Sequence, residues 1–497
     1  MHPPLPASTE RPARAHRHAG AQPQRGTSRL PMQALRSRRG AASIAFVTGT
    51  TALLGMAALA TEGGVWYMAR RNAQSAADAA AFTGATTLSM SGATAVDAAV
   101  QDVASLNGFT NGGRNTVTSS TLTWTGSASV NAVRVTITQT QTIGLARVLT
   151  GTSPVVSATA VAALNLGTGG ACSLSLGNVR NSTNITGSNV STGSNCVIAS
   201  NGQSTYSINV GGSANVNVYG LRASGRCTNC TPGGGRVSST TLVSEYQPPI
   251  SDPYGTNLGT NRKAMPSNLG TGGSVKCNSV SSTKSGSATA YTITPNTSTN
   301  GAAVCTDITV GNSDTLTLTP GTYYFAGASL SVTGGTVTCP TCDSATGKGV
   351  TLVFTNGTTT GNGNGNGNGN NNTNTVGTFS YTGGNVNLNA PNCSLTGSNC
   401  SDSDYSGVVI YRRNTTASDN SNGNTIRING NSSSSLNGAI YAPSSQIDYS
   451  GSMNQTNACT LLIGNTITYS GNSTMSLGSC GTYGSSAPRV VSVSLVQ

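Results

Sequence analysis

The sequence is poor in histidine, charge and aromatic side chains. It holds three His in 497 residues, His2, His16 and His18, and only 8% of its residues are charged. Everything after residue 18 therefore lacks an imidazole that could act as a general base, a triad member or a metal ligand. The sequence also has no phosphate-binding loop and no dinucleotide fingerprint. We predict no catalytic residue, no cofactor and no metal site.

Positive charge is concentrated at the N-terminal end. Of the 26 Lys and Arg, eight lie within residues 1–40, together with a single acid, Glu10. The remainder has little net charge and no Lys/Arg cluster beyond Arg71, which argues against a nucleic-acid partner. We predict that residues 1–40 form a disordered basic tail in the cytoplasm.

No charged residue lies between Arg39 and Glu62. Within this interval, residues 41–60 would form a helix about 30 Å long, which matches the apolar core of a bilayer. The Lys/Arg bias places the N-terminus in the cytoplasm and the C-terminal region in the periplasm or outside the cell. We predict a single-pass transmembrane helix over 41–60 in the cytoplasmic (inner) membrane. The alternatives are a secretory signal cleaved after Ala58-Leu59-Ala60 and a buried soluble helix.

All twelve cysteines follow this apolar interval. An even number of cysteines in an exported segment is typical of disulfides. A zinc site built from the two C-x-x-C pairs is an alternative, because that spacing suits tetrahedral ligands. Pairing chain neighbours gives six candidate disulfides: Cys172/Cys196, Cys227/Cys230, Cys277/Cys305, Cys339/Cys342, Cys393/Cys400 and Cys459/Cys480.

Residues 61–166 have the pattern of a small α+β domain. An Ala-rich run predicts a helix that continues the membrane helix outward. A second helix and three alternating runs follow, and the middle run would place Val133, Val135 and Ile137 on one face. The helices are expected over 65–88 and 93–106, and the strands over 116–124, 130–138 and 155–164.

Residues in and around the Ala-rich helix resemble the N-terminal module of TadE/TadG-like proteins. These belong to the Tad system, which assembles Flp pili in bacteria. Ala45 stands where TadE-type pseudopilins carry a Glu, five residues after the processing Gly, so the TadG-like branch fits better. The D-x-S-x-S metal motif of some TadG-like proteins is absent from the sequence. The resemblance covers about residues 36–165 and rests on Gly40, Glu62, Arg70, Arg71, Ala76, Ala77 and Asp78.

Residues 167–497 are rich in Gly, Asn, Ser and Thr, and alternate short apolar patches with turns. The segment 447–451 (IDYSG) recurs as 467–471 (ITYSG), an offset of 20 residues that is near one rung of a β-solenoid. We predict a large all-β domain, a right-handed parallel β-helix. A β-sandwich and a largely disordered Ser/Thr stalk are the alternatives. Residues 361–375 are expected to form a flexible loop.

Two functions from different classes fit these features. The first is a non-enzymatic, membrane-anchored envelope protein of Tad/Flp pilus assembly or surface attachment. Its partners would be the membrane and either other pilus-assembly proteins or cell-wall glycan. The alternative is an exported β-helix enzyme that acts on polysaccharide, with Arg412 and Arg413 as its candidate site. Asp402 and Asp404, the closest acid pair, are interpreted as solvated loop acids.

Overall fold

The structure, a computed structural model, describes residues 37–496 without 126–128, 145–146, 148–150, 188, 193–195, 260–265, 267–268, 270–274, 279, 298–301, 356–375, 399, 401, 414–424 and 452–457. The basic tail up to residue 36 and the expected loop 361–375 lie outside the described residues. The chain divides into two compact units. One comprises the part up to Met68 with Gln141–Pro154, and the other comprises Ala69–Thr140 with Val155–Gln497.

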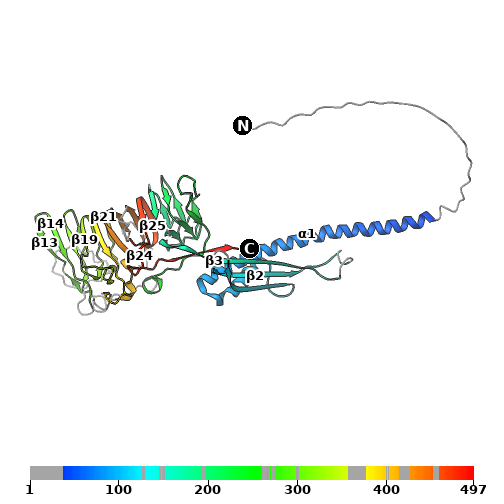
Figure 1. The fold of residues 1–497 in the computed structure, drawn as a ribbon, viewed down its shortest axis with the longest axis horizontal. Helices are drawn as coiled ribbons and strands as arrows, with labels where there is room; N and C mark the ends of the chain where they lie inside the picture. Colours follow the sequence, from blue (N-terminus) through cyan, green and yellow to red (C-terminus); the bar gives the residue numbers. More distant parts are fainter. Residues whose placement is uncertain are drawn as a thin grey trace, which may run out of the picture. The chain divides into compact units, whose positions relative to one another are not determined.

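Within the described part of the chain, one helix is long and apolar enough to cross a membrane. This helix is α1 (Ser37–Ser91), labelled in Figure 1. By sequence it begins in the first unit and ends in the second. It has no proline to interrupt its backbone hydrogen bonds, and alanine, the best helix former, predominates. Its most apolar window has a mean hydropathy of 1.7, and none of that window is buried within the protein.

Threonine hydroxyls in the apolar half of α1 are satisfied by the helix itself. Thr48, Thr50 and Thr51 each donate to the carbonyl oxygen four residues earlier, at 2.9, 2.7 and 2.7 Å. An unpaired hydroxyl would be costly in hydrocarbon, whereas a hydroxyl bonded to its own helix exposes little polarity. The threonines that dilute the apolar run are therefore compatible with a membrane span.

The second unit begins with a small module of helices against a sheet. After α1 come a 3-10 turn (Ala93–Ala95) and helix α2 (Val96–Leu106). Strand β2 (Ser129–Thr140) pairs antiparallel with both β1 (Asn115–Thr125) and β3 (Val155–Ser175). The expected shared face of the middle strand is confirmed, because the two valines and the isoleucine expected on it are fully buried. These residues are Val133, Val135 and Ile137.

The last strand of the chain completes this sheet. Strand β26 (Arg489–Leu495) pairs antiparallel with residues 162–170 in the middle of β3, with Val493 opposite Leu164. The order in the sheet is therefore β1, β2, β3, β26. The expected domain boundary at residue 166 lies inside β3, whose second half continues into the large domain.

The residues between β3 and β26 form a large domain made mostly of strands. Its named strands pair in parallel, apart from the antiparallel hairpin β13–β14. Its described helices are two short turns, Gly255–Gly259 and Ser403–Tyr405. Its further strands are β4 (Thr183–Ile185), β5 (Asn189–Thr192), β6 (Cys196–Ser200), β7 (Ile208–Val210), β8 (Asn215–Asn217), β9 (Gly220–Ala223), β10 (Cys227–Thr228), β11 (Leu242–Ser244), β12 (Cys277–Asn278), β13 (Ser281–Ser285), β14 (Ala288–Thr292), β15 (Ala303–Val304), β16 (Ile308–Val310), β17 (Thr315–Thr317), β18 (Gly321–Ala326), β19 (Leu330–Thr338), β20 (Val350–Thr355), β21 (Phe379–Asn389), β22 (Val408–Arg412), β23 (Ile426–Gly430), β24 (Ser435–Gly451) and β25 (Thr460–Met475).

These strands stack in an order that differs from their order in the chain. The first part of the domain stacks away from β3 in chain order, since β3 pairs with β6 and β6 pairs with β9. The second part of the domain begins at β12, which pairs with β15. From β15 the successive pairing partners are β18, β20, β22, β24 and β25. Strand β25 pairs with β3, β4 and β5, so the last rung of the domain lies against its first rung (Figure 1).

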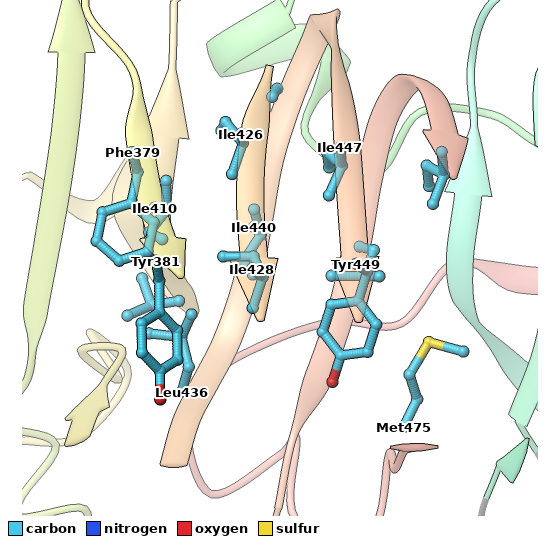
Figure 2. Packing of buried hydrophobic residues seen from close by; sticks show 14 of the residues in the cluster. Phe379, Tyr381, Ile410, Ile426, Ile428, Leu436, Ile440, Ile447, Tyr449 and Met475 are labelled. Carbon is cyan, nitrogen blue, oxygen red and sulfur yellow. The ribbon is translucent and has the colours of Figure 1, made fainter. Parts of the chain in front are cut away.

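Side chains at equivalent positions of neighbouring strands form rows along the stack. Ile447 lies opposite Ile467 and Tyr449 opposite Tyr469, so the repeat seen in the sequence marks two adjacent rungs. Figure 2 shows part of this buried interior. One row of buried apolar residues crosses eight strands: Val310, Val332, Tyr381, Ile428, Tyr449, Tyr469, Ile185 and Val210.

The long connection from β11 to β12 begins with a segment that we call the strap, residues 245–259. Asn201, directly after β6, exchanges two hydrogen bonds of 2.8 Å with the backbone of Ile250. The Tyr441 hydroxyl, in β24, donates to Asp252 Oδ2 at 2.7 Å. Since β6 and β24 belong to different rungs, the strap links parts of the stack that the chain builds at different times.

Asp252, which accepts the Tyr441 hydrogen bond, is a titratable group in the strap. Burial raises the pKa of its carboxyl above the ordinary value, although hydrogen bonds from Tyr441, Tyr254 and Gly255 oppose the shift. The folded chain then binds more protons than the unfolded chain between the two pKa values, so this group's contribution to stability falls as pH rises through that interval. We expect Asp252→Asn to lose less thermal stability than the parent as pH rises from 4 to 7, because its amide does not ionise, and its oxygen still accepts from Tyr441. The control is Asp102→Asn, which changes an exposed carboxyl and should lose as much stability as the parent. If Asp252→Asn also lost as much stability as the parent over this pH range, the expectation would be wrong.

The role of β26 is testable at Val493, which is 4% exposed and packs in the core of the module. Val493→Asp buries a carboxylate among apolar side chains, at a cost of about 3 kcal/mol or more. We expect a clearly lower midpoint of thermal unfolding, measured by circular dichroism. Leu495→Asp is the matched control, because Leu495 lies in the same strand and is 47% exposed. Equal midpoints for the two variants would show that β26 does not stabilise the module.

Candidate functional site

The alanines of the predicted motif form the packing face of α1. Ala76 and Ala77 are buried, as are Ala73, Ala80 and Ala81 on the same helix. These positions recur at helical spacing, and their small side chains let the helix lie close to α2 and to the sheet. The Ala-rich stretch is therefore a close-packing surface of the module.

A polar contact joins α1 to the sheet next to this surface. Gln74 Nε2 donates to Asp78 Oδ1 at 2.8 Å, one helical turn later, and to the carbonyl oxygen of Thr159 in β3 at 3.2 Å. Arg70 is exposed and lines an open groove of about 730 Å³ together with Gln74 and Arg134. Arg71 is also exposed and does not line this groove. Gln74 is thus the link between Asp78 and the sheet.

The other two motif residues lie in the first unit. Glu62 Oε1 accepts a hydrogen bond from the backbone N–H of Gly144 at 3.1 Å. A Cβ atom on Gly144 would lie 3.2 Å from that oxygen, so a side chain there would crowd the contact. Glu62 therefore joins α1 to the backbone at Gly144. Gly40 lies in the first turns of α1.

Gly84 is a packing residue that the sequence patterns did not identify. A Cβ atom at this position would lie 2.9 Å from Val100 Cγ2 in α2 and 2.9 Å from Val133 Cγ1 in β2. Real Cβ atoms do not approach carbon atoms so closely, so the three elements can meet only because residue 84 has no side chain. Its spacing of four residues from the buried Ala80 is the sequence signal that would have indicated this role.

Gly84→Leu should destabilise the chain by about 1–3 kcal/mol, because it forces α2 and β2 away from α1. Gly63→Leu is the matched control, since Gly63 is also in α1 and a Cβ there would meet nothing within 4 Å. We expect the midpoint of thermal unfolding to fall for the first variant and to stay close to the parent for the second. Parent-like unfolding of Gly84→Leu would disprove the close packing.

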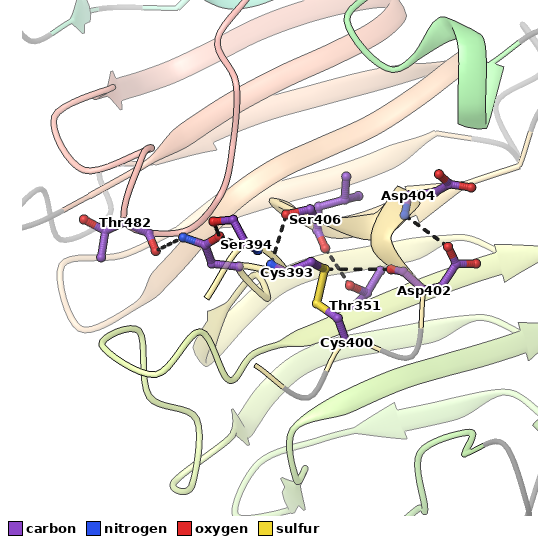
Figure 3. Close-up of a disulfide and its surroundings, with 10 residues drawn as sticks. Thr351, Cys393, Ser394, Cys400, Asp402, Asp404, Ser406 and Thr482 are labelled. Atoms are coloured by element: carbon purple, nitrogen blue, oxygen red, sulfur yellow. Dashed lines mark hydrogen bonds between the residues drawn. A yellow bond between two sulfur atoms is a disulfide. The ribbon is translucent and has the colours of Figure 1, made fainter. Parts of the chain in front are cut away.

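All twelve cysteines are in disulfides. Because both C-x-x-C pairs are oxidised, their sulfurs are not available as zinc ligands, and the described residues contain no group of three His, Cys, Asp or Glu that could hold a metal. Figure 3 shows the bridge between Cys393 and Cys400. The pairs are the neighbours expected from the sequence: Cys172–Cys196, Cys227–Cys230, Cys277–Cys305, Cys339–Cys342, Cys393–Cys400 and Cys459–Cys480.

The residues considered for polysaccharide chemistry make structural contacts. Asp402 caps a short helical turn, accepting a hydrogen bond from the N–H of Asp404 at 3.0 Å (Figure 3). Arg412 is fully buried and donates to the carbonyl oxygens of Gly377 and Val376 at 2.9 and 3.0 Å and to Ser445 Oγ. The Arg412 guanidinium is therefore part of the interior and is not presented to a substrate.

The module and the helix before it match two known family models. Residues 40–87 match the Flp pilus-assembly TadE/G-like family model, and residues 64–162 match the Tad-like Flp pilus-assembly model. Residues 40–162, which include most of the helix-and-sheet module, are thus similar to Tad-family domains of Flp pilus assembly. No curated protein and no solved structure matches the chain. The family domains support a role related to pilus assembly, and the apolar half of α1 fits a membrane-anchored protein.

Proposed function

We propose that this chain is a non-enzymatic, membrane-anchored component of Flp pilus assembly or surface attachment. The observation that carries the proposal is that the matched Tad domains include the apolar stretch and the packed module together. Helix α1 would hold the chain in the cytoplasmic membrane with the basic tail on the cytoplasmic side. The large domain would then lie on the other side of that membrane, where an oxidising compartment suits its six disulfides.

We also propose that the large domain is a parallel β-helix. The support is that three series of strands pair in parallel, so that each strand of one rung lies next to the equivalent strand of the rung before. For example, β3, β4 and β5 each pair with a different part of β25, and then with β6, β7 and β8 respectively. The right-handed sense expected from the sequence stays a prediction.

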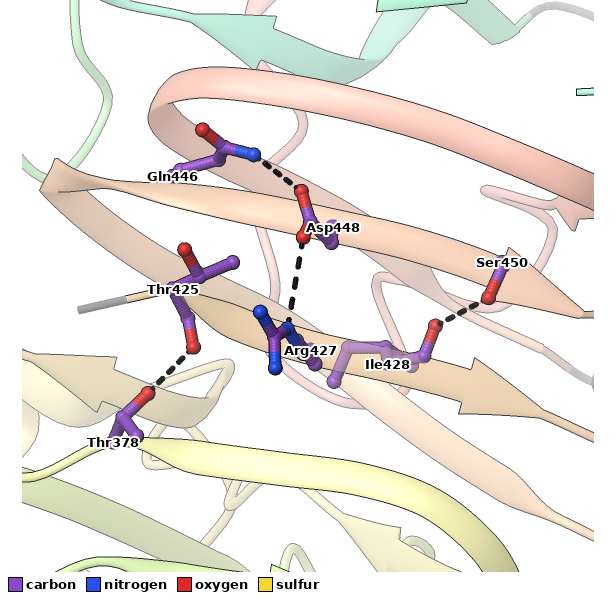
Figure 4. Close-up of polar contacts among 7 residues, drawn as sticks. All are labelled: Thr378, Thr425, Arg427, Ile428, Gln446, Asp448 and Ser450. Carbon is purple, nitrogen blue, oxygen red and sulfur yellow. Dashed lines mark hydrogen bonds and ion pairs between the residues drawn. The ribbon is translucent and has the colours of Figure 1, made fainter. Parts of the chain in front are cut away.

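The outer surface of this stack would serve as the binding surface. One outward row is formed by polar side chains from nine strands, seven of them hydroxyl or amide side chains, spaced about 4.8 Å apart by the strand separation. Its charged members, Arg427 and Asp448, pair with each other at 3.8 Å (Figure 4). Such a row offers hydrogen bonds to the hydroxyls of cell-wall glycan or to a partner protein. The row consists of Thr309, Ser331, Ser380, Arg427, Asp448, Thr468, Asn184, Asn209 and Thr228.

A deletion strain tests the proposal. We expect loss of the gene to reduce pili or surface attachment, counted by electron microscopy and by an adhesion assay. Complementation with the parent chain should restore both, and so should complementation with Asp404→Asn, since no acid–base step is involved. Normal pili and attachment in the deletion strain, with depolymerisation of a polysaccharide by the purified protein, would establish the enzyme alternative.

A further inference from the structure

A buried guanidinium lies where the large domain meets the sheet of the module. Arg222 in β9 is 3% exposed. Its Nε and Nη2 donate to the carbonyl oxygen of Val491 in β26 at 3.2 and 2.9 Å, and Nη2 also donates to the carbonyl oxygen of Pro248 in the strap. Its Nη1 is buried and has no hydrogen-bond partner among the described residues.

The charge of Arg222 has no counterion in the described part of the chain. The acceptors of its hydrogen bonds are neutral carbonyl groups, and no described carboxylate forms an ion pair with it. Burial lowers the pKa of Arg222 to about 10, so the side chain is still cationic at neutral pH. A buried cation without a counterion is costly, and an anionic carboxylate is the acceptor that best fits the unpartnered Nη1 in a charge-assisted hydrogen bond.

Arg222 also lines a cavity of about 420 Å³. Prolines contribute much of its wall, namely Pro248, Pro249, Pro253 and Pro488, and the exposed Arg489 lines it as well. This combination of apolar walls with a few polar groups is the usual make-up of a small-molecule or peptide-end site, and the volume falls in the normal range for such sites.

We propose that this cavity binds an apolar carboxylate, with the carboxylate paired to Arg222 and the apolar body packed against the prolines. Two sources have this chemistry, the carboxyl terminus of a partner polypeptide that ends in an apolar residue, and a free small acid. The binding site is independent of the proposed pilus role. A ligand there would contact the strap, β9 and the start of β26 together, so it would stabilise the junction that closes the module.

The test uses the full-length chain in detergent micelles and isothermal titration calorimetry. The probes are N-acetyl-leucine, its neutral isostere N-acetyl-leucinamide, and an acetylated tetrapeptide that ends in leucine with a free carboxyl group. We expect the acid to bind at least about tenfold more tightly than the amide, because the amide cannot form the charge-assisted pair. Tighter binding of the tetrapeptide than of N-acetyl-leucine would identify a polypeptide end as the ligand, and equal or weaker binding would identify a free small acid.

Two variants distinguish the cavity from nonspecific binding. Arg222→Met should lose the preference for the acid, whereas the exposed Arg226→Met, outside the cavity, should keep it. If Arg222→Met does not fold, Ser251→Trp serves instead, because it fills the cavity from an exposed wall residue and leaves the guanidinium in place. Absence of binding by both acids, equal affinity for acid and amide, or acid binding that survives Ser251→Trp would overturn the proposal.

Discussion

Strand β3 is the element on which the rest of the second unit depends, because both ends of the large domain close on it. Its beginning pairs with β2 and its middle with β26 in the module, and its end pairs with β6 and β25 in the stack. Backbone groups of a buried strand must be paired, so β3 needs partners along its whole length. Two of these partners, β25 and β26, come from the last 40 residues of the chain.

This arrangement makes the large domain an insertion within one sheet of the module. Its first three rungs are built by chain that directly follows β3, and the remaining rungs return to β3 from the other end of the stack. The strap spans this gap, and Tyr411 in β22 donates to the carbonyl oxygen of Leu258 at 2.8 Å near its end. Pairing partners so distant in the chain have a large closure entropy, which argues for late formation of the β3–β25 and β3–β26 contacts in folding.

Local patterns in the sequence were sufficient to predict the elements of the module. The Ala stripe, the alternation at Val133, Val135 and Ile137, and the charge-free stretch after Arg39 each report on one element and its immediate environment. The repeat at Ile447 and Ile467 likewise predicted adjacent rungs, since consecutive strands of a stack lie next to each other. Neighbouring cysteines pair for the same reason.

The residues that prediction missed are those whose role depends on distant parts of the chain. Nothing near β9 in the sequence indicates that Arg222 meets Val491, which lies 269 residues away. The position of β25 beside β3 and the contribution of β26 to the module were equally invisible, because register between distant strands leaves no periodic signal. For Arg412 the sequence suggested a functional contact that the structure does not provide. An arginine after an apolar run was considered for a surface site, whereas the interior binds it through three acceptors.

Native-state hydrogen exchange of the full-length chain tests most directly whether β3 unites the module and the large domain. The amides of β3 residues 162–164 report on the module, and those of residues 173–174 report on the stack. If the account is correct, both sets exchange with the same free energy of opening and the same dependence on denaturant, because losing either end of β3 disrupts both. Module amides that stay protected after the stack amides have opened would contradict it.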